Sequence, residues 1–139
     1  MMKNEGCKLK GEGAVKQVVE VKKVPAVGPY SQAVEAGGFV FCSGQIPIDP
    51  RSGRLVESGI GEATRQVMKN LSAVLDEAGL SLQDVVKTTI YLVNLDDFAT
   101  VNEIYGSFFD GAFPARSTVQ VAALPKGVPI ELEAVAVRP

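Results

Sequence analysis

The chain has 139 residues, a formal net charge of −2 and no histidine, and 46% of its residues are hydrophobic. This size and apolar content fit one domain that buries roughly two thirds of the surface of its unfolded chain, and the acidic balance argues against nucleic acid, which selects clustered Lys and Arg. The absence of histidine removes the usual general base and the commonest metal ligand, which excludes a Ser/His/Asp triad and zinc-dependent hydrolysis.

The N-terminal segment 1–16 mixes Lys, Glu and Gly and has no hydrophobic centre of the kind a signal peptide needs. We predict that 1–16 is a disordered extension. No apolar run in the chain reaches the roughly 18 residues of a membrane span, so a cytoplasmic protein is expected. The two cysteines, Cys7 and Cys42, provide neither a disulfide framework nor metal-ligand spacing, and Cys42 is expected in the core.

The residues that follow predict a β-meander. Strands are predicted at 18–21, 31–35 and 39–43. Gly37 and Gly38 separate the last two strands and suit a tight hairpin turn, because glycine accepts positive φ.

Apolar residues then recur at helical spacing and predict an amphipathic helix of roughly five turns. They are Ile60, Ala63, Val67, Leu71, Val74, Leu75 and Ala78. Gly79 stands where a glycine C-cap is expected, and the helix is therefore predicted to end there.

A capped turn at Ser81, with Asp84 three residues on, leads into a β-branched strand at 85–93. Asp96 or Asp97 is predicted to cap a second helix, and two strands at 117–122 and 130–137 end the domain. The apolar face of this helix holds Phe98, Val101, Ile104, Tyr105 and Phe108.

The predicted order βββαβαββ gives an α+β fold, a mixed β-sheet with two helices on one face. The other face of the sheet is left without helices. An apolar face of this kind is usually buried between subunits, so we expect a symmetric homo-oligomer.

One arginine and two glutamates stand out against the apolar strands of the C-terminal third. Arg116 can hold a carboxylate through two parallel hydrogen bonds, which lysine cannot do. Glu131 and Glu133 lie two residues apart in an alternating segment and are predicted on the same face of a strand. Two interpretations stay open here: a structural ion pair between Arg116 and one of the glutamates, or a pocket for a carboxylate ligand.

Five blocks of sequence, in order and at fitting intervals, resemble the RidA/YjgF family of enamine/imine deaminases. They are GPYSQA (28–33), SGQIP (43–47), DFATVN (97–102), PARS (114–117) and IELEA (130–134). The resemblance runs from about Val18 to Arg138, so we take 17–139 as a RidA-like domain.

The resemblance implies a chorismate-mutase-like fold assembled as a homotrimer, with clefts between neighbouring subunits and neither cofactor nor metal. It implies a hydrolase that converts 2-iminopropanoate (with its enamine, 2-aminoacrylate) and 2-iminobutanoate to 2-keto acids and ammonia. Pyridoxal-phosphate-dependent dehydratases release these reactive compounds. The expected partners are thus a small 2-imino or 2-keto acid and further copies of the chain, with nucleic acid and membrane not expected.

By the same resemblance, Arg116 binds the substrate carboxylate and Glu131 holds the attacking water. The substrate-binding positions are Tyr30, Gly44, Asn102, Arg116 and the backbone of Thr118. Many family members have cysteine at position 118 and an acidic residue where Gln120 stands. Burial would raise the pKa of Glu131 and Arg116 would lower it, and we favour a water anchor over a general base.

Each of these residues also has a purely structural interpretation. Tyr30 could plug the end of the sheet, Gly44 could mark a bulge or a close backbone approach, and Asn102 could face solvent. Ser43 could line the cleft or bond to the neighbouring strand.

The alternative function is a non-enzymatic regulatory or chaperone-like binding protein on the same trimeric scaffold. The paired Arg116 and Glu131 favour the enzyme. A translation inhibitor acting as a ribonuclease is the weakest reading, because the chain has no histidine and is net acidic.

Overall fold

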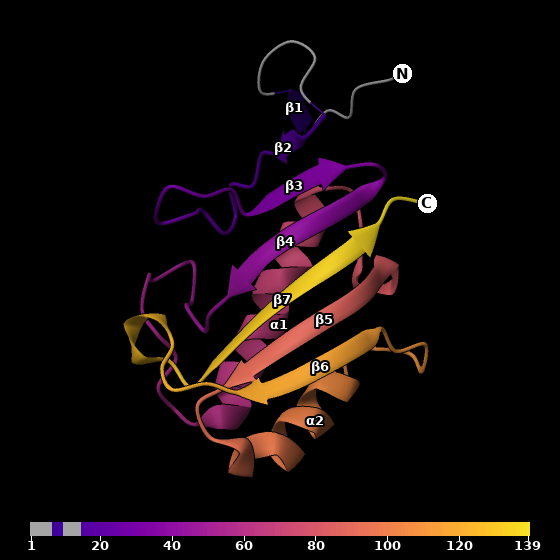
Figure 1. The fold of residues 1–139 in the computed structure, drawn as a ribbon. Helices are drawn as coiled ribbons and strands as arrows, with labels where there is room; N and C mark the ends of the chain where they lie inside the picture. The colour runs from indigo at the N-terminus through magenta and orange to yellow at the C-terminus, as the bar shows by residue number, and fades with distance from the viewer. Residues whose placement is uncertain (1–6, 10–14) are drawn as a thin grey trace.

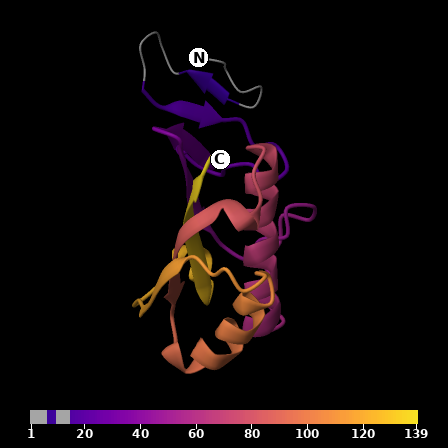
Figure 2. The ribbon, with the colours of Figure 1, turned by 90° about the vertical axis from the view of Figure 1, so that its right-hand side faces the viewer.

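Two α-helices cover one face of a mixed sheet in the computed structural model, which describes residues 7–9 and 15–139 (Figure 1). The view in Figure 2 places both helices on the same side of the sheet. In chain order the elements are β1 (Cys7–Leu9), β2 (Gln17–Val19), β3 (Ala33–Ala36), β4 (Phe39–Gln45), α1 (Ile60–Glu77), η1 (Leu82–Asp84), β5 (Val85–Leu92), η2 (Leu95–Asp97), α2 (Phe98–Gly106), β6 (Ala115–Gln120), η3 (Pro125–Gly127) and β7 (Ile130–Val137).

The strand order across the sheet is β1-β2-β3-β4-β7-β5-β6. Only β5 and β6 pair in parallel within the described part of the chain, and α2 connects them as a crossover. The predicted α+β class, the mixed sheet and the two helices on one face are confirmed. All eight predicted elements are present, with boundaries that differ by up to two residues at β2, β3, β4 and β6 and by one residue at β5.

The N-terminal segment adds a strand that the sequence did not predict. Cys7–Leu9 pairs antiparallel with β2, with Cys7 opposite Val19. The rest of the segment predicted to be disordered, residues 1–6 and 10–14, lies outside the described residues, so that prediction stays untested there.

The predicted turn and cap residues occupy the positions expected of them. Gly37 and Gly38 have φ of 59° and 83° and join β3 to β4 as predicted. At the end of α1 the Gly79 amide donates to the Asp76 carbonyl (3.0 Å) and the Leu80 amide to that of Leu75 (2.8 Å), a Schellman motif. Ser81 forms the predicted capping box.

The cap predicted at Asp96 or Asp97 is wrong in one respect. Asp97 occupies the N-cap position of α2, but its side chain makes no capping hydrogen bond. The cap lies one turn earlier, where the side chain of Asn94 accepts from the Asp96 amide at 2.9 Å and starts η2. The 3₁₀ turn then continues into α2.

The core forms where α1 packs on the sheet. Each of these elements presents its apolar stripe to the other, and the side chains are fully buried there. The largest of them are Met68, Leu71, Leu75, Ile90, Leu92, Ile130 and Leu132. Cys42 lies in this core as predicted, and burial raises the pKa of its thiol to about 12.

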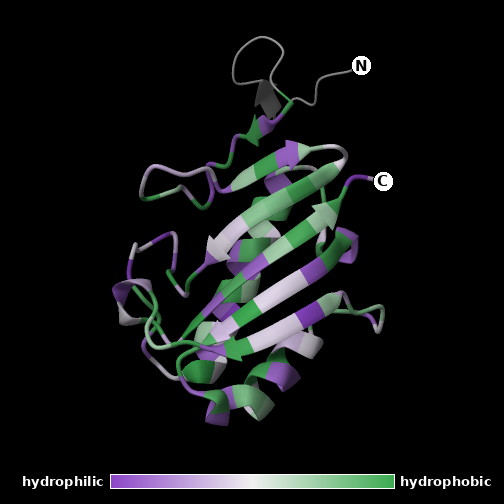
Figure 3. Cartoon of the chain, viewed as in Figure 1, coloured by the Kyte–Doolittle hydropathy of each residue, from purple (hydrophilic) through white to green (hydrophobic). Residues whose placement is uncertain are grey.

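The helix-free face of the sheet is mixed in character. Phe39 and Phe41 on β4 are 44% and 48% exposed, and apolar and polar residues alternate over the first half of β7 (Figure 3). Ile130 and Leu132 point into the core, so Glu131 and Glu133 share the helix-free face as predicted. No helix in the described part of the chain is long and apolar enough to cross a bilayer.

Candidate functional site

The Glu131 hollow opens at one end of the sheet and has a volume of about 400 Å³. Glu131 comes from β7, Ser43 and Gly44 from β4, and Tyr30 from the loop before β3. Lys126 of η3 lines the rim, with its backbone in the left-handed region (φ 59°). The hollow thus gathers three of the predicted site residues, Tyr30, Gly44 and Glu131.

Gly44 lies directly against the Glu131 carboxylate. A Cβ atom at position 44 would stand 1.9 Å from Glu131 Oε2 and 2.8 Å from its Cδ, so a side chain here fits only if the Glu131 carboxylate moves aside. The register between β4 and β7 also shifts between Cys42 and Gln45. Both readings of Gly44, an irregularity in the strand and a close approach, therefore hold, and the close approach is to the candidate catalytic group.

The environment of Glu131 favours its protonated form. Burial raises the pKa of the Glu131 carboxyl above its ordinary value, and the negative charge of Glu133 on the same face raises it further. Arg116 makes no contribution to this shift, and within the described residues it forms no ion pair with either glutamate. The structural ion pair is excluded in the single chain.

The Arg116 hollow, of about 340 Å³, lies over β6 and α2. The guanidinium of Arg116 sits 5.6 Å from the ring centroid of Phe98 and 5.2 Å from that of Tyr105. Cation–π contacts of this kind hold the planar group in place and leave its N–H donors for a ligand. The Tyr105 hydroxyl and the buried Thr88 hydroxyl share a hydrogen bond of 2.7 Å, which fixes the ring.

Two unpaired polar atoms lie on the same side of the sheet as Arg116. Asn102 Oδ1 and Thr118 Oγ1 are buried and have no hydrogen-bond partner among the described residues. Buried polar atoms normally find a partner, so these two remain available to a polar group from outside the chain. Asn102 is only half-buried overall and lines the hollow, so it does not simply face solvent.

The remaining open interpretations are resolved by contacts. Tyr30 is 45% exposed and lines the Glu131 hollow, so it does not plug the sheet. Ser43 lines the same hollow and also donates to the Ser31 carbonyl at 2.5 Å. Gln120 Oε1 accepts from the Leu95 amide at 2.8 Å, a structural role that a carboxylate could equally fill.

The structure therefore divides the predicted residues into two groups. Tyr30, Gly44 and Glu131 meet in one hollow, whereas Asn102, Arg116 and Thr118 gather on the α2 side of the sheet. Sequence reasoning missed two features. Tyr105 has core spacing, which predicts packing alone, and Lys126 carries no signal in the sequence beyond the neighbouring Gly127.

A mixed sheet backed by two helices, with an arginine and a glutamate lining separate hollows, defines a small α+β protein with a divided polar site. Residues 20–138 match the family model described as Endoribonuclease L-PSP. The chain belongs to this family, which confirms the RidA/YjgF resemblance.

Similar proteins match along nearly their whole length. A RutC family protein of Pyrococcus abyssi is 52% identical over 122 residues, which cover 87% of this chain and 96% of that protein. The 2-iminobutanoate/2-iminopropanoate deaminase of Homo sapiens is 50% identical over 125 residues, covering 89% and 91%. The crystal structure of E. coli TdcF with bound serine superposes with a TM-score of 0.83 at 44% identity, covering 88% and 98%.

Proposed function

We propose that this protein hydrolyses small 2-imino acids, 2-iminopropanoate with its enamine 2-aminoacrylate and 2-iminobutanoate, to 2-keto acids and ammonia in the cytoplasm. The observation that carries the proposal is that the chain presents one side chain suited to a carboxylate and another suited to water. An arginine held by two aromatic rings suits a carboxylate, and a glutamate with a raised pKa suits a water molecule. Relatives that bear the deaminase name support the same reaction.

In this proposal the Arg116 guanidinium binds the substrate carboxylate through two parallel hydrogen bonds. Glu131 holds a water molecule beside the imine carbon, which is electrophilic once the imine nitrogen is protonated. The water oxygen adds to that carbon and its proton passes to Glu131. Glu131 returns this proton to the amino nitrogen of the tetrahedral intermediate, the C–N bond breaks, and ammonia leaves. The water oxygen then gives its second proton to Glu131 and becomes the keto oxygen. The raised pKa of Glu131 brings this carboxylate closer to the pKa of an effective general base near neutral pH, which favours a base role over that of a water anchor.

One chain keeps Arg116 and Glu131 in different hollows, so the reaction needs a second copy to join them. We therefore also propose a homotrimer of chorismate-mutase-like chains, in which the Arg116 hollow of one subunit faces the Glu131 hollow of the next. The exposed Phe39 and Phe41 and the unpaired atoms of Asn102 and Thr118 support a contact of this kind.

The test couples a threonine dehydratase to the protein and follows 2-ketobutyrate while semicarbazide competes for the imine. Arg116→Ala should lower the rate by at least about two orders of magnitude, since a bidentate contact to a charged group contributes about 3 kcal/mol. Arg65→Ala is the matched control, because Arg65 lies exposed on α1 and, among the described residues, forms an ion pair only with Glu62.

Near-full activity of Arg116→Ala would overturn the site. Wild-type protein that is folded yet does not outcompete semicarbazide would instead favour the binding-protein alternative. Thermal stabilisation by 2-ketobutyrate then separates the two alternatives further, because only a pocket that binds the keto acid raises the melting temperature.

A further inference from the structure

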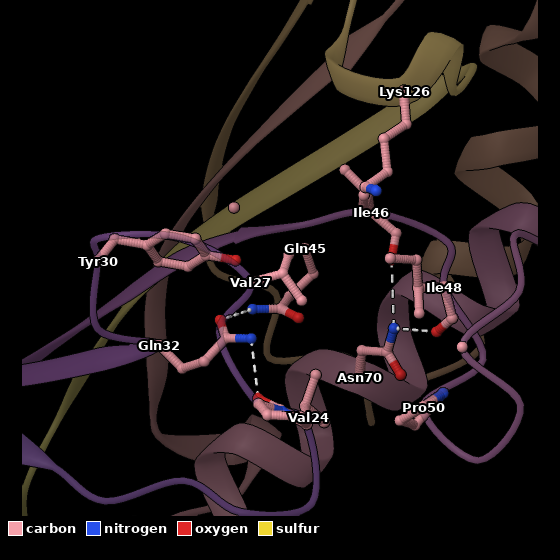
Figure 4. A pocket seen from close by; sticks show the side chains of 13 residues that line it. Val24, Val27, Tyr30, Gln32, Gln45, Ile46, Ile48, Pro50, Asn70 and Lys126 are labelled. Atoms are coloured by element: carbon pink, nitrogen blue, oxygen red, sulfur yellow. Dashed lines mark hydrogen bonds between the residues drawn. The ribbon is translucent and has the colours of Figure 1, made fainter.

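A third hollow, the Gln45 pocket, lies between the loop before β3, the end of β4 and α1, and encloses about 190 Å³ (Figure 4). Its walls are mostly apolar. The apolar residues that line it are Val24, Pro25, Val27, Ile46, Ile48 and Pro50. Three buried amides, Gln32, Gln45 and Asn70, supply the polar part of the lining.

In two of these three amides, both the nitrogen and the oxygen have a hydrogen-bond partner. Asn70 Nδ2 donates to the carbonyls of Ile46 (3.2 Å) and Ile48 (2.8 Å), and its Oδ1 accepts from Gln66 (2.9 Å). Gln32 Nε2 donates to the Val24 carbonyl at 2.9 Å, while Gln32 Oε1 accepts from Gln45 Nε2 at 2.8 Å. Neither amide has a polar atom without a partner.

Gln45 differs, because its oxygen has no donor among the described residues. Gln45 Nε2 donates to Gln32 Oε1 and to the Ser43 carbonyl (3.2 Å), and the oxygen points away from Gln32 into the pocket (Figure 4). The residue as a whole is only 3% exposed. A ligand in the pocket that carries a donor would take the place of water at this oxygen.

The orientation of this amide is set by groups that can only accept. The Val24 carbonyl requires the nitrogen of Gln32, which turns Gln32 Oε1 toward Gln45. Gln32 Oε1 and the Ser43 carbonyl in turn both require the nitrogen of Gln45. If oxygen and nitrogen were exchanged at either residue, an amide oxygen would face another acceptor oxygen. The oxygen of Gln45 must therefore face the pocket.

We propose that the Gln45 pocket binds a small apolar molecule of about six or seven non-hydrogen atoms that donates one hydrogen bond to Gln45 Oε1. The size follows from a comparison, since an apolar cavity of about 150 Å³ takes up benzene. The chemical class is that of simple phenols and similar ring alcohols. This site goes beyond the proposed imine hydrolysis and does not depend on it. Tyr30 and Gly44 line both hollows, so an occupant lies against the wall of the Glu131 hollow.

The test compares two probes of nearly equal shape, phenol and fluorobenzene, by methyl and side-chain amide NMR of the wild-type protein. Phenol should shift the methyl signals of Val24, Ile46 and Ile48 and the amide signal of Gln45. Fluorobenzene has no donor and should bind at least about fivefold more weakly, the worth of one neutral hydrogen bond. Equal binding of the two probes, or no shift with phenol because only water occupies the pocket, would overturn the proposal.

A variant pair tests the location. Val24→Phe places a ring inside the pocket and should abolish phenol binding, whereas Val21→Phe makes the same change three residues earlier, outside the lining, and should leave it intact. Phenol shifts that persist in folded Val24→Phe would place the site elsewhere. Should Val24→Phe not fold, the comparison of the two probes on wild-type protein still decides.

Discussion

Gly44 and Glu131 show how a single hydrogen atom in place of a methyl group positions a candidate catalytic group. In Gly44→Ala the new Cβ would clash with the carboxylate, which is the free end of a flexible side chain and can move aside. We expect the fold to survive and imine hydrolysis to fall about 100-fold, since a displacement of about 1 Å can cost that much. The coupled dehydratase assay measures the rate, and circular dichroism checks the fold.

Gly28→Ala is the control for this change. A Cβ at position 28 would meet the Tyr30 ring at an ordinary 3.5 Å, so activity should stay within a few-fold of wild type. Equal losses in the two variants would mean that glycine in this region matters for general reasons rather than for the position of Glu131.

The raised pKa of Glu131 predicts a pH-dependent cost to stability. A native carboxyl that holds its proton more tightly than the unfolded one makes the protein less stable as pH rises from the ordinary value of 4.5 through the native pKa. Glu131→Gln should therefore unfold at higher urea than wild type at pH 7, and the gap should close below pH 4.5. Glu20→Gln, at an exposed position, is the matched control. A gap of the same size at pH 4 and pH 7 would contradict burial as its cause.

The chemistry of the site residues could be predicted from sequence, but their grouping could not. Strand alternation correctly placed Glu131 and Glu133 together. The position of Arg116 relative to them depends on pairing, because Arg116 stands opposite Thr88 and Glu131 opposite Tyr91. Thr88 and Tyr91 lie three apart on β5 and so face opposite sides of the sheet, and their partners do the same. Only the register of β5 with both neighbours reveals this.

At the scale of elements, Arg138 joins three parts of the fold. Its guanidinium donates to both carboxylate oxygens of Glu35 on β3 (2.8 and 2.9 Å) and to the carbonyl of Ala78 at the end of α1 (2.9 Å). Both side chains are largely shielded, at 25% and 15% exposure. Arg138→Met should lower the free energy of unfolding by about 2 kcal/mol, measured by urea titration. Arg138→Lys should recover only part, because lysine cannot make the paired bonds.

Lys23→Met provides the comparison, since Lys23 and Asp76 form an exposed pair that water screens. Its effect on unfolding should be much smaller than that of Arg138→Met. A similar loss in both variants would show that Arg138 acts as an ordinary surface charge.

The elements that the sequence predicted best are those with long, unbroken periods. The helix predicted to end at Gly79 is Ile60–Glu77, and the strand predicted at 130–137 is Ile130–Val137. Elements that depend on pairing were less accurate. β6 begins two residues earlier than predicted because Ala115 already pairs with Lys87, and β1 exists only through its pairing with β2.

At the scale of the whole molecule, the separation of Arg116 from Glu131 turns the proposed trimer into a quantitative prediction. If each site takes its arginine from one subunit and its glutamate from the next, Arg116→Ala and Glu131→Gln homotrimers are both inactive. Co-expression of the two variants should restore activity, because an intact Arg116 can then face an intact Glu131. With random assembly about one quarter of the sites receive both residues, so mixed trimers should show about one quarter of wild-type activity.

The same experiment contains its controls. The two purified homotrimers, mixed without exchange of subunits, should stay inactive, and light scattering should give a trimeric mass for every sample. Mixed trimers as inactive as their parents would mean that one chain supplies both residues, against the separation seen across the sheet. A monomeric mass would remove the shared cleft altogether. Recovery near one quarter would instead assign the Arg116 hollow and the Glu131 hollow to opposite walls of one site, which no single chain contains.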